Sequence, residues 1–351
     1  MKGENGLKLR VGIIGAGGIS VESHLPVLKS LDGVEVIAIC DQQVTIAKEA
    51  AIRFGIHSIY SDAKEMLSNS KLDVVDICTP PRTHAPLSIL AMEAGCNVLC
   101  EKPMATSVEE ANEMVGCSKK NKVKLCTVHQ NLCNPVIMKA HELINSGAMG
   151  KILHVSLRTY ERRDSELCQN KDHWCHKLPG GIFYEIIPHP VYLSQLFLKD
   201  PQVGNVSGKR MSDRNWMKND ELRVLLHAEN GFGSIVASCN SMIHGDTIDI
   251  FGSEMGLRAD LWGRTMIMFR PHGQSPKSIG MNNLNLSLQL FKVIGSTMSI
   301  VFKAIRGKAS AHHMFISKFV ESITNNSEPP TTPEDGLETV KLLDLICKQI
   351  K

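Results

Sequence analysis

The sequence predicts an α/β protein. The first part reads as a doubly wound parallel sheet, and the second as an α+β domain with an open-faced, mostly antiparallel sheet. From Leu9 to about Val128, short apolar segments alternate with helical patterns. A glycine-rich turn, Gly15-Ala16-Gly17, follows the first apolar segment. After Val128, strand patterns follow one another without intervening helices, which is typical of antiparallel sheets.

Six strands are expected in the first part. They are rich in Val, Ile, Leu and Cys and show no polar alternation, as expected of strands covered by helices on both faces. We place them at 9–14, 34–40, 57–60, 73–78, 96–100 and 123–128. Helical patterns lie between them, among others at Val44–Phe54, Ala85–Ala94 and Val108–Lys120. This repetition of βαβ units predicts a parallel sheet.

The second part begins with a helix expected at Pro135–Ser146 and a long strand at Lys151–Arg158. The hairpin signal Glu229-Asn230-Gly231 separates two further strand segments. These two strands are expected at 222–228 and 233–239, and three more follow at 247–251, 256–261 and 265–269. We place the boundary near 128–134, which divides the chain into domains 1–130 and 131–351.

Composition limits the classes of function. A chain of 351 residues exceeds one ordinary core, and a net charge of +3 gives no general case for nucleic-acid binding. Eleven cysteines without paired spacing fit reduced thiols, hence a cytoplasmic protein. No secretory signal and no apolar stretch long enough to span a membrane is evident. We expect a small-molecule partner, with neither nucleic acid nor membrane.

The glycine turn has the features of a dinucleotide site. Gly15 permits the tight turn, Gly17 lets the backbone approach a pyrophosphate, and the amides of Gly18-Ile19-Ser20 open a helix N-terminus. Asp41 ends the second strand, where a carboxylate can accept ribose hydroxyls and would repel a 2′-phosphate. Because Gln42-Gln43 offers no cation, NAD is favoured over NADP. The alternative is a glycine turn without a ligand.

A second motif, Glu101-Lys102-Pro103, directly follows the apolar segment 96–100. A lysine at the carboxyl end of a parallel strand points into the crevice where open α/β sheets bind ligands. The adjacent proline fixes φ, so Lys102 lies on a constrained turn. We expect this lysine beside the reactive end of the dinucleotide, the alternative being a solvated turn lysine.

With these motifs the chain resembles the glucose–fructose oxidoreductase, inositol dehydrogenase and MocA (Gfo/Idh/MocA) family of nicotinamide-dependent oxidoreductases. The resemblance covers roughly 9–200 and returns at Pro333-Glu334-Asp335-Gly336. It rests on the two motifs above together with Cys78-Thr79-Pro80-Pro81, His84, Asn134-Pro135, 146–151, Gly180-Gly181, Glu185 and His189.

The resemblance implies a set of cofactor positions, which match Thr79, Pro80, His84, Glu101, Lys102 and Gln130 here. The first three would line the trough for adenosine and nicotinamide. The next two would lie beside the nicotinamide ribose and the reacting carbon, and the last near the carboxamide. The family's second domain commonly uses its open sheet for subunit contacts, so a homodimer or homotetramer is expected.

The chemistry expected is hydride transfer between NAD and a secondary alcohol or ketone of a sugar, cyclitol or related substrate. His189 is the candidate base, because imidazole titrates near neutral pH. Glu185, four residues earlier on the same expected helix, could orient it. Lys102 would hydrogen-bond the substrate oxygen.

Departures from the family leave alternatives open. Where the family has Asp, Gly, His and Asp, this chain has Glu185, Ile187, His189 and Tyr192. Two other functions stay open: a redox-neutral reaction in which bound NAD is transiently reduced during hydrolysis or elimination of a sugar, and a non-catalytic NAD-binding sensor.

Two further features have plain interpretations. Cys168, His173, Cys175 and His176 cluster, but their spacing matches no paired zinc pattern, so no metal site is expected. An apolar stripe with a basic side over 286–308 predicts a helix. A buried or subunit-contact helix is favoured there over one lying on a membrane surface.

Overall fold

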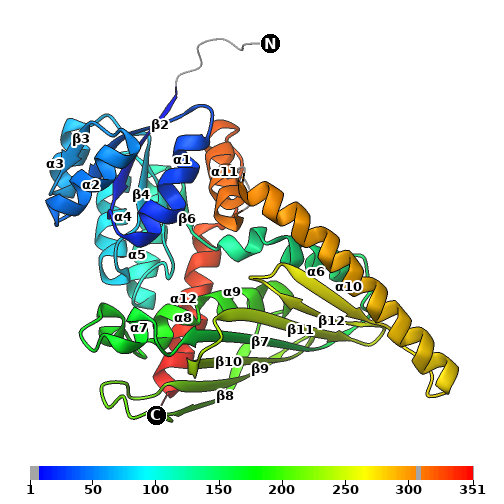
Figure 1. The fold of residues 1–351 in the computed structure, drawn as a ribbon. Helices are drawn as coiled ribbons and strands as arrows, with labels where there is room; N and C mark the ends of the chain where they lie inside the picture. The colour runs from blue at the N-terminus through cyan, green and yellow to red at the C-terminus, as the bar shows by residue number, and fades with distance from the viewer. Residues whose placement is uncertain (1–7, 306–309, 351) are drawn as a thin grey trace, which may run out of the picture. The chain divides into compact units, whose positions relative to one another are not determined.

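The computed structural model describes residues 8–305 and 310–350 (Figure 1). The chain divides into two compact units. The first extends to Gln130, where the first domain was expected to end, and also includes His312–Lys341. The second comprises Asn131–Ala311 and Leu342–Lys351. The segment 312–341 thus belongs to the first unit, whereas the sequence placed it in the second domain.

The sheet of the first unit is built from six strands: β1 (Leu9–Ile14), β2 (Val34–Cys40), β3 (Ser58–Tyr60), β4 (Val74–Ile77), β5 (Asn97–Cys100) and β6 (Leu125–Thr127). They are parallel, in the order β3-β2-β1-β4-β5-β6. The predicted doubly wound sheet is therefore confirmed. The apolar strands are buried because helices pack on them.

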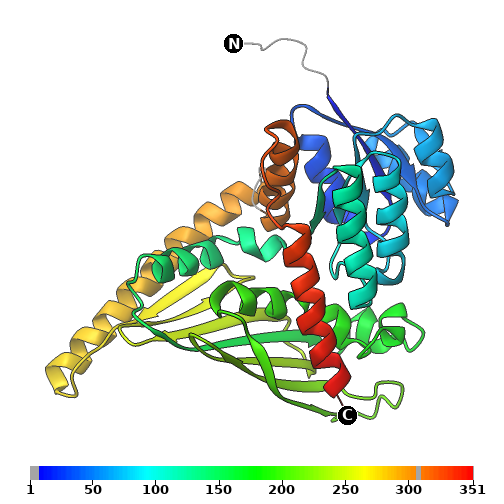
Figure 2. The ribbon, with the colours of Figure 1, turned by 180° about the vertical axis from the view of Figure 1, so that it is seen from behind.

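The helices of this sheet are a π-helix (Ser20–His24), α1 (Leu25–Ser30), α2 (Val44–Phe54), α3 (Ala63–Asn69), α4 (His84–Glu93) and α5 (Val108–Asn121). Side-chain caps explain where two of them begin. Asp62 accepts the amide of Glu65 at the start of α3, and Ser107 accepts that of Glu110 at the start of α5. Figure 2 shows α4 and α5 side by side, as their contacts also indicate.

The returning segment consists of α11 (Ala311–Thr324) and the first part of α12 (Pro333–Gln349). Leu337 and Val340 join the core formed by the parallel sheet and its helices. Gly336 allows the close approach, since a Cβ there would lie 2.7 Å from Met104 Sδ and 2.8 Å from Thr127 Oγ1. These contacts attach α12 to the first unit.

A 3₁₀ turn (Gln130–Cys133) leads from the first unit into the second, whose first helix is α6 (Pro135–Asn145). Its sheet contains β7 (Ile152–Arg162), β8 (Gln202–Lys209), β9 (Glu221–Ala228), β10 (Gly231–Ser241), β11 (Gly245–Gly252), β12 (Gly256–Asp260) and β13 (Thr265–Phe269). The order is β13-β12-β11-β7-β10-β9-β8, and only the β7–β10 pair among these is parallel. The predicted open-faced, mostly antiparallel sheet is confirmed.

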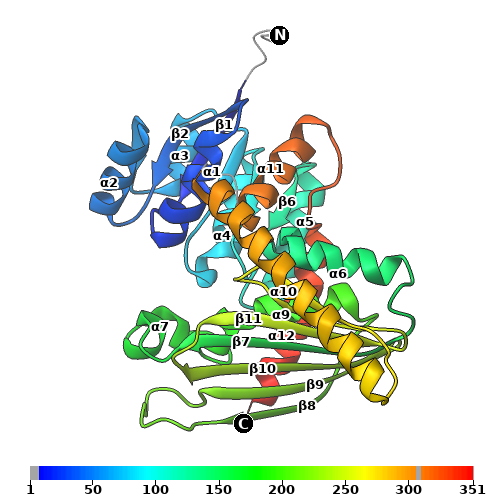
Figure 3. The same cartoon turned by 45° about the vertical axis from the view of Figure 1, so that its right-hand side comes forward.

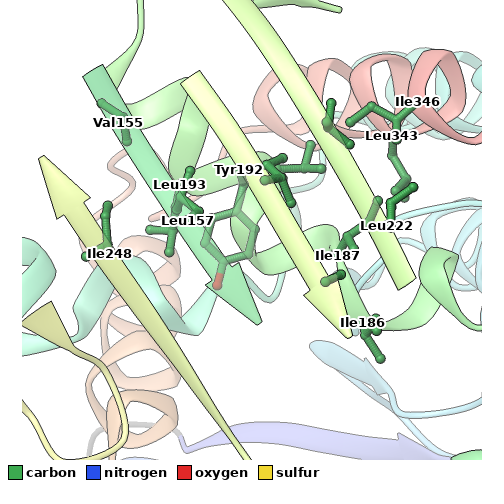
Figure 4. Close-up of a cluster of buried hydrophobic side chains, with 14 of the residues drawn as sticks. Val155, Leu157, Ile186, Ile187, Tyr192, Leu193, Leu222, Ile248, Leu343 and Ile346 are labelled. Carbon is green, nitrogen blue, oxygen red and sulfur yellow. The ribbon is translucent and has the colours of Figure 1, made fainter. Parts of the chain in front are cut away.

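One face of this sheet is covered by short helices and the end of α12. The helices are α7 (Glu166–Gln169), α8 (Phe183–Ile186) and α9 (Pro188–Phe197), with a 3₁₀ turn at Trp174–Lys177. Figure 4 shows Leu157, Tyr192 and Ile248 in the resulting core, with Leu343 and Ile346 of α12. The core therefore positions α9, which carries His189.

The predicted helix over 286–308 lies within α10 (Pro276–Ile305), a single long helix (Figure 3). Leu288 and Phe291 are 51% and 69% exposed, so within one chain these two positions are not core. The side chains of 292–305, and residues 306–308 altogether, lie outside the described part. Within that part, no helix combines the length and apolar character needed to cross a membrane.

Candidate active site

The glycine turn follows β1 and opens toward solvent. Gly15 has φ +97°, and a Cβ there would lie 2.7 Å from the backbone of Cys78, so only glycine fits. Gly17, Gly18 and Ile19 are exposed, and a Cβ on either glycine would meet nothing within 4 Å. The described residues leave this space open. Exposed amides at a helix start suit a pyrophosphate.

Asp41 lies next to this turn, directly after β2. One carboxylate oxygen accepts the amide of Ala16 at 2.9 Å, and the other accepts that of Gln43 at 2.8 Å. These bonds fix the carboxylate against the glycine turn. The remaining lone pairs stay available for ribose hydroxyls.

The loop after β4 carries Thr79, Pro80 and His84. Thr79 is partly exposed and Pro80 is exposed, as expected for a trough wall, but His84 is fully buried. Its ring nitrogens lie 2.8 Å from the Pro103 carbonyl and 2.7 Å from the Thr79 carbonyl. Burial, the largest effect, lowers the pKa of His84. His84 thus braces two loops, which differs from the lining position implied by the resemblance.

Glu101 and Lys102 follow β5, on the same edge of the sheet as the glycine turn. The Lys102–Pro103 peptide bond is cis, and the lysine is partly exposed. Glu101 is 6% exposed, and its Oε2 accepts the amide of Lys102 at 3.0 Å. The Glu101 carboxylate therefore holds the backbone of Lys102 by a hydrogen bond.

A buried histidine that the sequence analysis did not identify holds this carboxylate. His24, at the end of the π-helix, is fully buried, with Nε2 2.9 Å from Glu101 Oε1 and Nδ1 2.8 Å from Asp76 Oδ2. Burial, the largest single effect, lowers the pKa of His24, but the charges and hydrogen bonds of Asp76 and Cys78 together outweigh it, and the pKa lies well above its usual value. Burial, again the largest single effect, raises the pKa of Glu101, yet the hydrogen bond from His24 and the charges of His24, His312 and Lys102 together lower it to about 2.

Two groups of ligand atoms among the described residues come within 4.8 Å of one another, and both contain His24. One adds Glu101 and His312, and the other adds Asp76 and Cys78. Both ring nitrogens of His24 already face carboxylates, so a metal ion would have to displace one of them. The expected absence of a metal remains a prediction.

Gln130 lies at the end of the first unit, just after β6. Its Oε1 is buried and has no hydrogen-bond partner among the described residues. Such an orphaned acceptor is costly unless a ligand satisfies it. A primary carboxamide could donate to it.

In the second unit, the single helix expected to carry Glu185 and His189 is divided into α8 and α9. Ile187 separates the two helices, and Pro188 begins α9. The assumption of one continuous helix was therefore wrong, because Pro188 has no backbone donor and occupies the first helical position instead. Whether Glu185 orients His189 stays a prediction.

Tyr192, noted in the sequence only as a departure from the family, contacts His189. Its hydroxyl lies 3.0 Å from His189 Nδ1 and accepts the amide of Asn131 at 3.2 Å. The side chain of Tyr192 is 3% exposed, while His189 is partly exposed. The spacing of three residues on a helix was the signal that could have identified this pair.

Comparison with known proteins agrees with this fold. Residues 9–129 match the family described as "Oxidoreductase family, NAD-binding Rossmann fold", and 137–258 match "GFO/IDH/MocA C-terminal domain". D-glucoside 3-dehydrogenase of Escherichia coli is 34% identical over 155 residues, which are 44% of either chain. Myo-inositol 2-dehydrogenase of Thermotoga maritima is 25% identical, over 72% of this chain and 75% of its own.

The chain spans about half the length of several curated relatives that it matches, 36–59% for four of them. Among solved structures, WlbA dehydrogenase from Bordetella pertussis, in complex with NADH and UDP-GlcNAcA, has a TM-score of 0.79 at 21% identity. That match covers 97% of this chain and 95% of the other, and it shows the shared fold. With both domains matched by its profiles, the chain belongs to the Gfo/Idh/MocA family of oxidoreductases and carries that family's NAD-binding Rossmann domain.

Proposed function

We propose that this protein is an NAD-dependent oxidoreductase that transfers a hydride between nicotinamide and a secondary alcohol or ketone of a sugar, cyclitol or related substrate. One observation carries the proposal. The exposed amides after β1 and Lys102 after β5 lie at the carboxyl ends of strands separated only by β4. That edge is where open parallel sheets bind nucleotides.

The residues present fit the cofactor. Open space over Gly17 and Gly18 suits the pyrophosphate, Asp41 suits the ribose, and the orphaned Gln130 Oε1 suits the carboxamide. When bound, NAD would supply the hydride-accepting carbon. The carboxylate of Asp41 disfavours a 2′-phosphate, so a titration should give tighter binding of NAD than of NADP. The reverse preference would refute the role of Asp41.

Three side chains have roles in the proposed chemistry. The Lys102 ammonium donates a hydrogen bond to the substrate oxygen and stabilises the negative charge that develops on it. The His189 imidazole accepts the hydroxyl proton during oxidation and returns it during reduction. Glu185 is proposed to orient or stabilise the protonated imidazole.

The substrate class is supported by the names of the relatives. Three relatives are named as dehydrogenases of polyhydroxy compounds: D-glucoside 3-dehydrogenase, D-apiose dehydrogenase and myo-inositol 2-dehydrogenase. Such compounds offer the secondary alcohol that the proposed chemistry requires.

The test is a panel of sugars, glycosides and cyclitols incubated with the protein and NAD. Accumulation of absorbance from reduced nicotinamide is expected for at least one of them. Product without net reduction would support the redox-neutral cycle instead. No product with intact NAD binding would support the sensor.

We also propose that the open sheet face forms a subunit interface and that the protein is a cytoplasmic homodimer or homotetramer. Phe232, Phe251 and Leu225 project from this face and are 52%, 42% and 42% exposed. A group of exposed large apolar side chains on a sheet indicates a binding surface. Light scattering should show an oligomer that Phe232→Glu weakens, and a monomeric wild-type protein would refute this.

A further inference from the structure

His24 lies between carboxylates from two neighbouring strands. Asp76 is on β4 and Glu101 directly follows β5, and these residues are 1% and 6% exposed. The ring of His24 bridges them, with one nitrogen 2.8 Å from Asp76 and the other 2.9 Å from Glu101. Water does not reach this ring, which is 0% exposed.

With both carboxylates ionised, this geometry requires a doubly protonated ring. Ionised carboxylates only accept hydrogen bonds, so both ring nitrogens must donate. A neutral ring would leave two buried like charges with only one ring N–H to share, which is strongly unfavourable. The raised pKa of His24 and the lowered pKa of Glu101 agree with this assignment.

Other titratable groups around the ring do not replace this cation. The Cys78 thiol donates to Asp76 at 3.7 Å, and burial raises its pKa to about 12, so it stays neutral. The ring of His312, from α11, lies 5.9 Å away, and burial lowers its pKa to about 4. Lys102 adds a positive charge near Glu101.

The carboxylate of Glu101 transmits the position of His24 to the lysine. Oε1 contacts the ring, while Oε2 accepts the backbone amide of Lys102 at 3.0 Å. The amide of Glu101 itself donates to Ile77 at 2.9 Å, so the backbone is held to β4 as well. A series of hydrogen bonds therefore connects the His24 ring, through the Glu101 carboxylate, to the backbone of Lys102.

We propose that His24 is a positioning residue: a buried imidazolium that fixes the Glu101 carboxylate and, through it, the turn that presents Lys102. The proposal rests on the proposed function only for its effect on turnover. The charge on His24 and its coupling to Glu101 are independent of any substrate.

The substrate-free test uses ¹⁵N-histidine labelling, with the His24 signals assigned by their loss in His24→Gln. At about pH 8.5, some two units above the ordinary histidine pKa, both nitrogens of His24 should still give imidazolium shifts. A neutral tautomer at that pH would overturn the proposal. This result does not depend on whether a substrate is known, so it is distinguishable from failure of the proposed function.

The second test compares thermal unfolding. His24→Gln leaves Glu101 without its cation and should lower the unfolding midpoint. Adding Glu101→Gln removes the unpaired charge, so the double variant should be more stable than His24→Gln alone. Additive losses would overturn the coupling.

Turnover is measured once a substrate is found. His24→Gln should lower kcat by about 10- to 100-fold through misplacement of Lys102, with the Kd for NAD changed less than about threefold. Two variants of the same unit serve as controls. His57→Gln alters an exposed histidine, and Asn97→Ala removes bonds to Asp73 and Lys124 at the opposite end of β5. Unchanged kcat in His24→Gln, or equal loss in Asn97→Ala, would overturn the proposal.

Discussion

The hydroxyl of Tyr192 lies 3.0 Å from Nδ1 of His189, and the two rings meet edge to face at 89°. The same hydroxyl accepts the amide of Asn131 at 3.2 Å. If His189 is to accept a proton at Nε2, its other nitrogen must carry the proton and donate it to Tyr192. The tyrosine hydroxyl can accept this hydrogen bond, so the contact orients the imidazole and is compatible with the tautomer that a base requires.

Tyr192→Phe should consequently lower kcat/KM about tenfold, the equivalent of one orienting hydrogen bond, and should alter the limb of the pH–rate profile that reports His189. The matched control is Tyr60→Phe, which removes a hydroxyl that accepts Ser70 Oγ at 3.1 Å in the first unit. An unchanged pH profile in Tyr192→Phe would exclude this role.

Lys102→Met keeps an unbranched side chain that is one atom shorter, but removes its charge. Because the glycine turn and Asp41 make the main cofactor contacts, the Kd for NAD should stay within about threefold. Turnover should fall by about 100-fold or more, since the donor to the substrate oxygen is lost. The check is steady-state kinetics beside an NAD titration, with the exposed Lys71→Met as control. Turnover equal to wild type would remove the lysine from the mechanism.

Most of the fold could be predicted because its strands are either continuously apolar or alternating. β8 was not predicted, since Gln202–Lys209 is polar and mostly exposed at the sheet edge. The return of 312–341 to the first unit depends on tertiary contacts of Gly336, which no local pattern reveals.

The residues of the candidate site likewise fall into those that the sequence predicts and those that it does not. Gly15, Asp41 and Lys102 follow strands, so local sequence predicts their place at one sheet edge. His24 and Asp76 are recognisable only after folding, because a lone histidine on an apolar helix and a lone aspartate within a strand carry no pattern. Only the folded sheet brings the two together.

The acid dependence of stability should follow from Glu101. Its pKa falls from 4.5 to about 2 on folding, so its contribution is fully present above pH 4.5 and is lost as the pH falls toward 2. The contribution of His24 to stability depends on pH in the opposite direction. Because the pKa of His24 is raised on folding, this residue stabilises the folded state fully below pH 6.5 and less as the pH rises. Between pH 4.5 and pH 6.5 both residues therefore contribute fully to stability.

Glu101→Gln removes the carboxylate and so isolates its contribution to the pH dependence of stability. The difference in unfolding free energy between wild type and variant should narrow by about 2 kcal/mol from pH 5 to pH 3, because each pH unit below 4.5 is worth about 1.4 kcal/mol. His24 stays protonated throughout this range in both states. Denaturant titrations at each pH measure the difference, and a constant value would contradict the lowered pKa.

Gly336 offers a test of how α12 packs on the first unit. Gly336→Ala would place a methyl group 2.7 Å from Met104 Sδ and 2.8 Å from Thr127 Oγ1, both buried. Overpacking of this kind costs about 1–3 kcal/mol. Gly116→Ala, on the exposed side of α5 with nothing within 4 Å, should instead stabilise by about 0.5–1 kcal/mol.

A double-mutant cycle connects this cost to the proposed contact. Met104→Ala destabilises by opening a cavity, but it also frees the space that the new methyl group needs. The penalty of Gly336→Ala should therefore be smaller in the Met104→Ala background than in wild type, and the two effects should not add. Additive penalties in denaturant unfolding would mean that residue 336 does not pack on Met104. The packing of 312–341 on the first unit would then depend on the core contacts of Leu337 and Val340 instead.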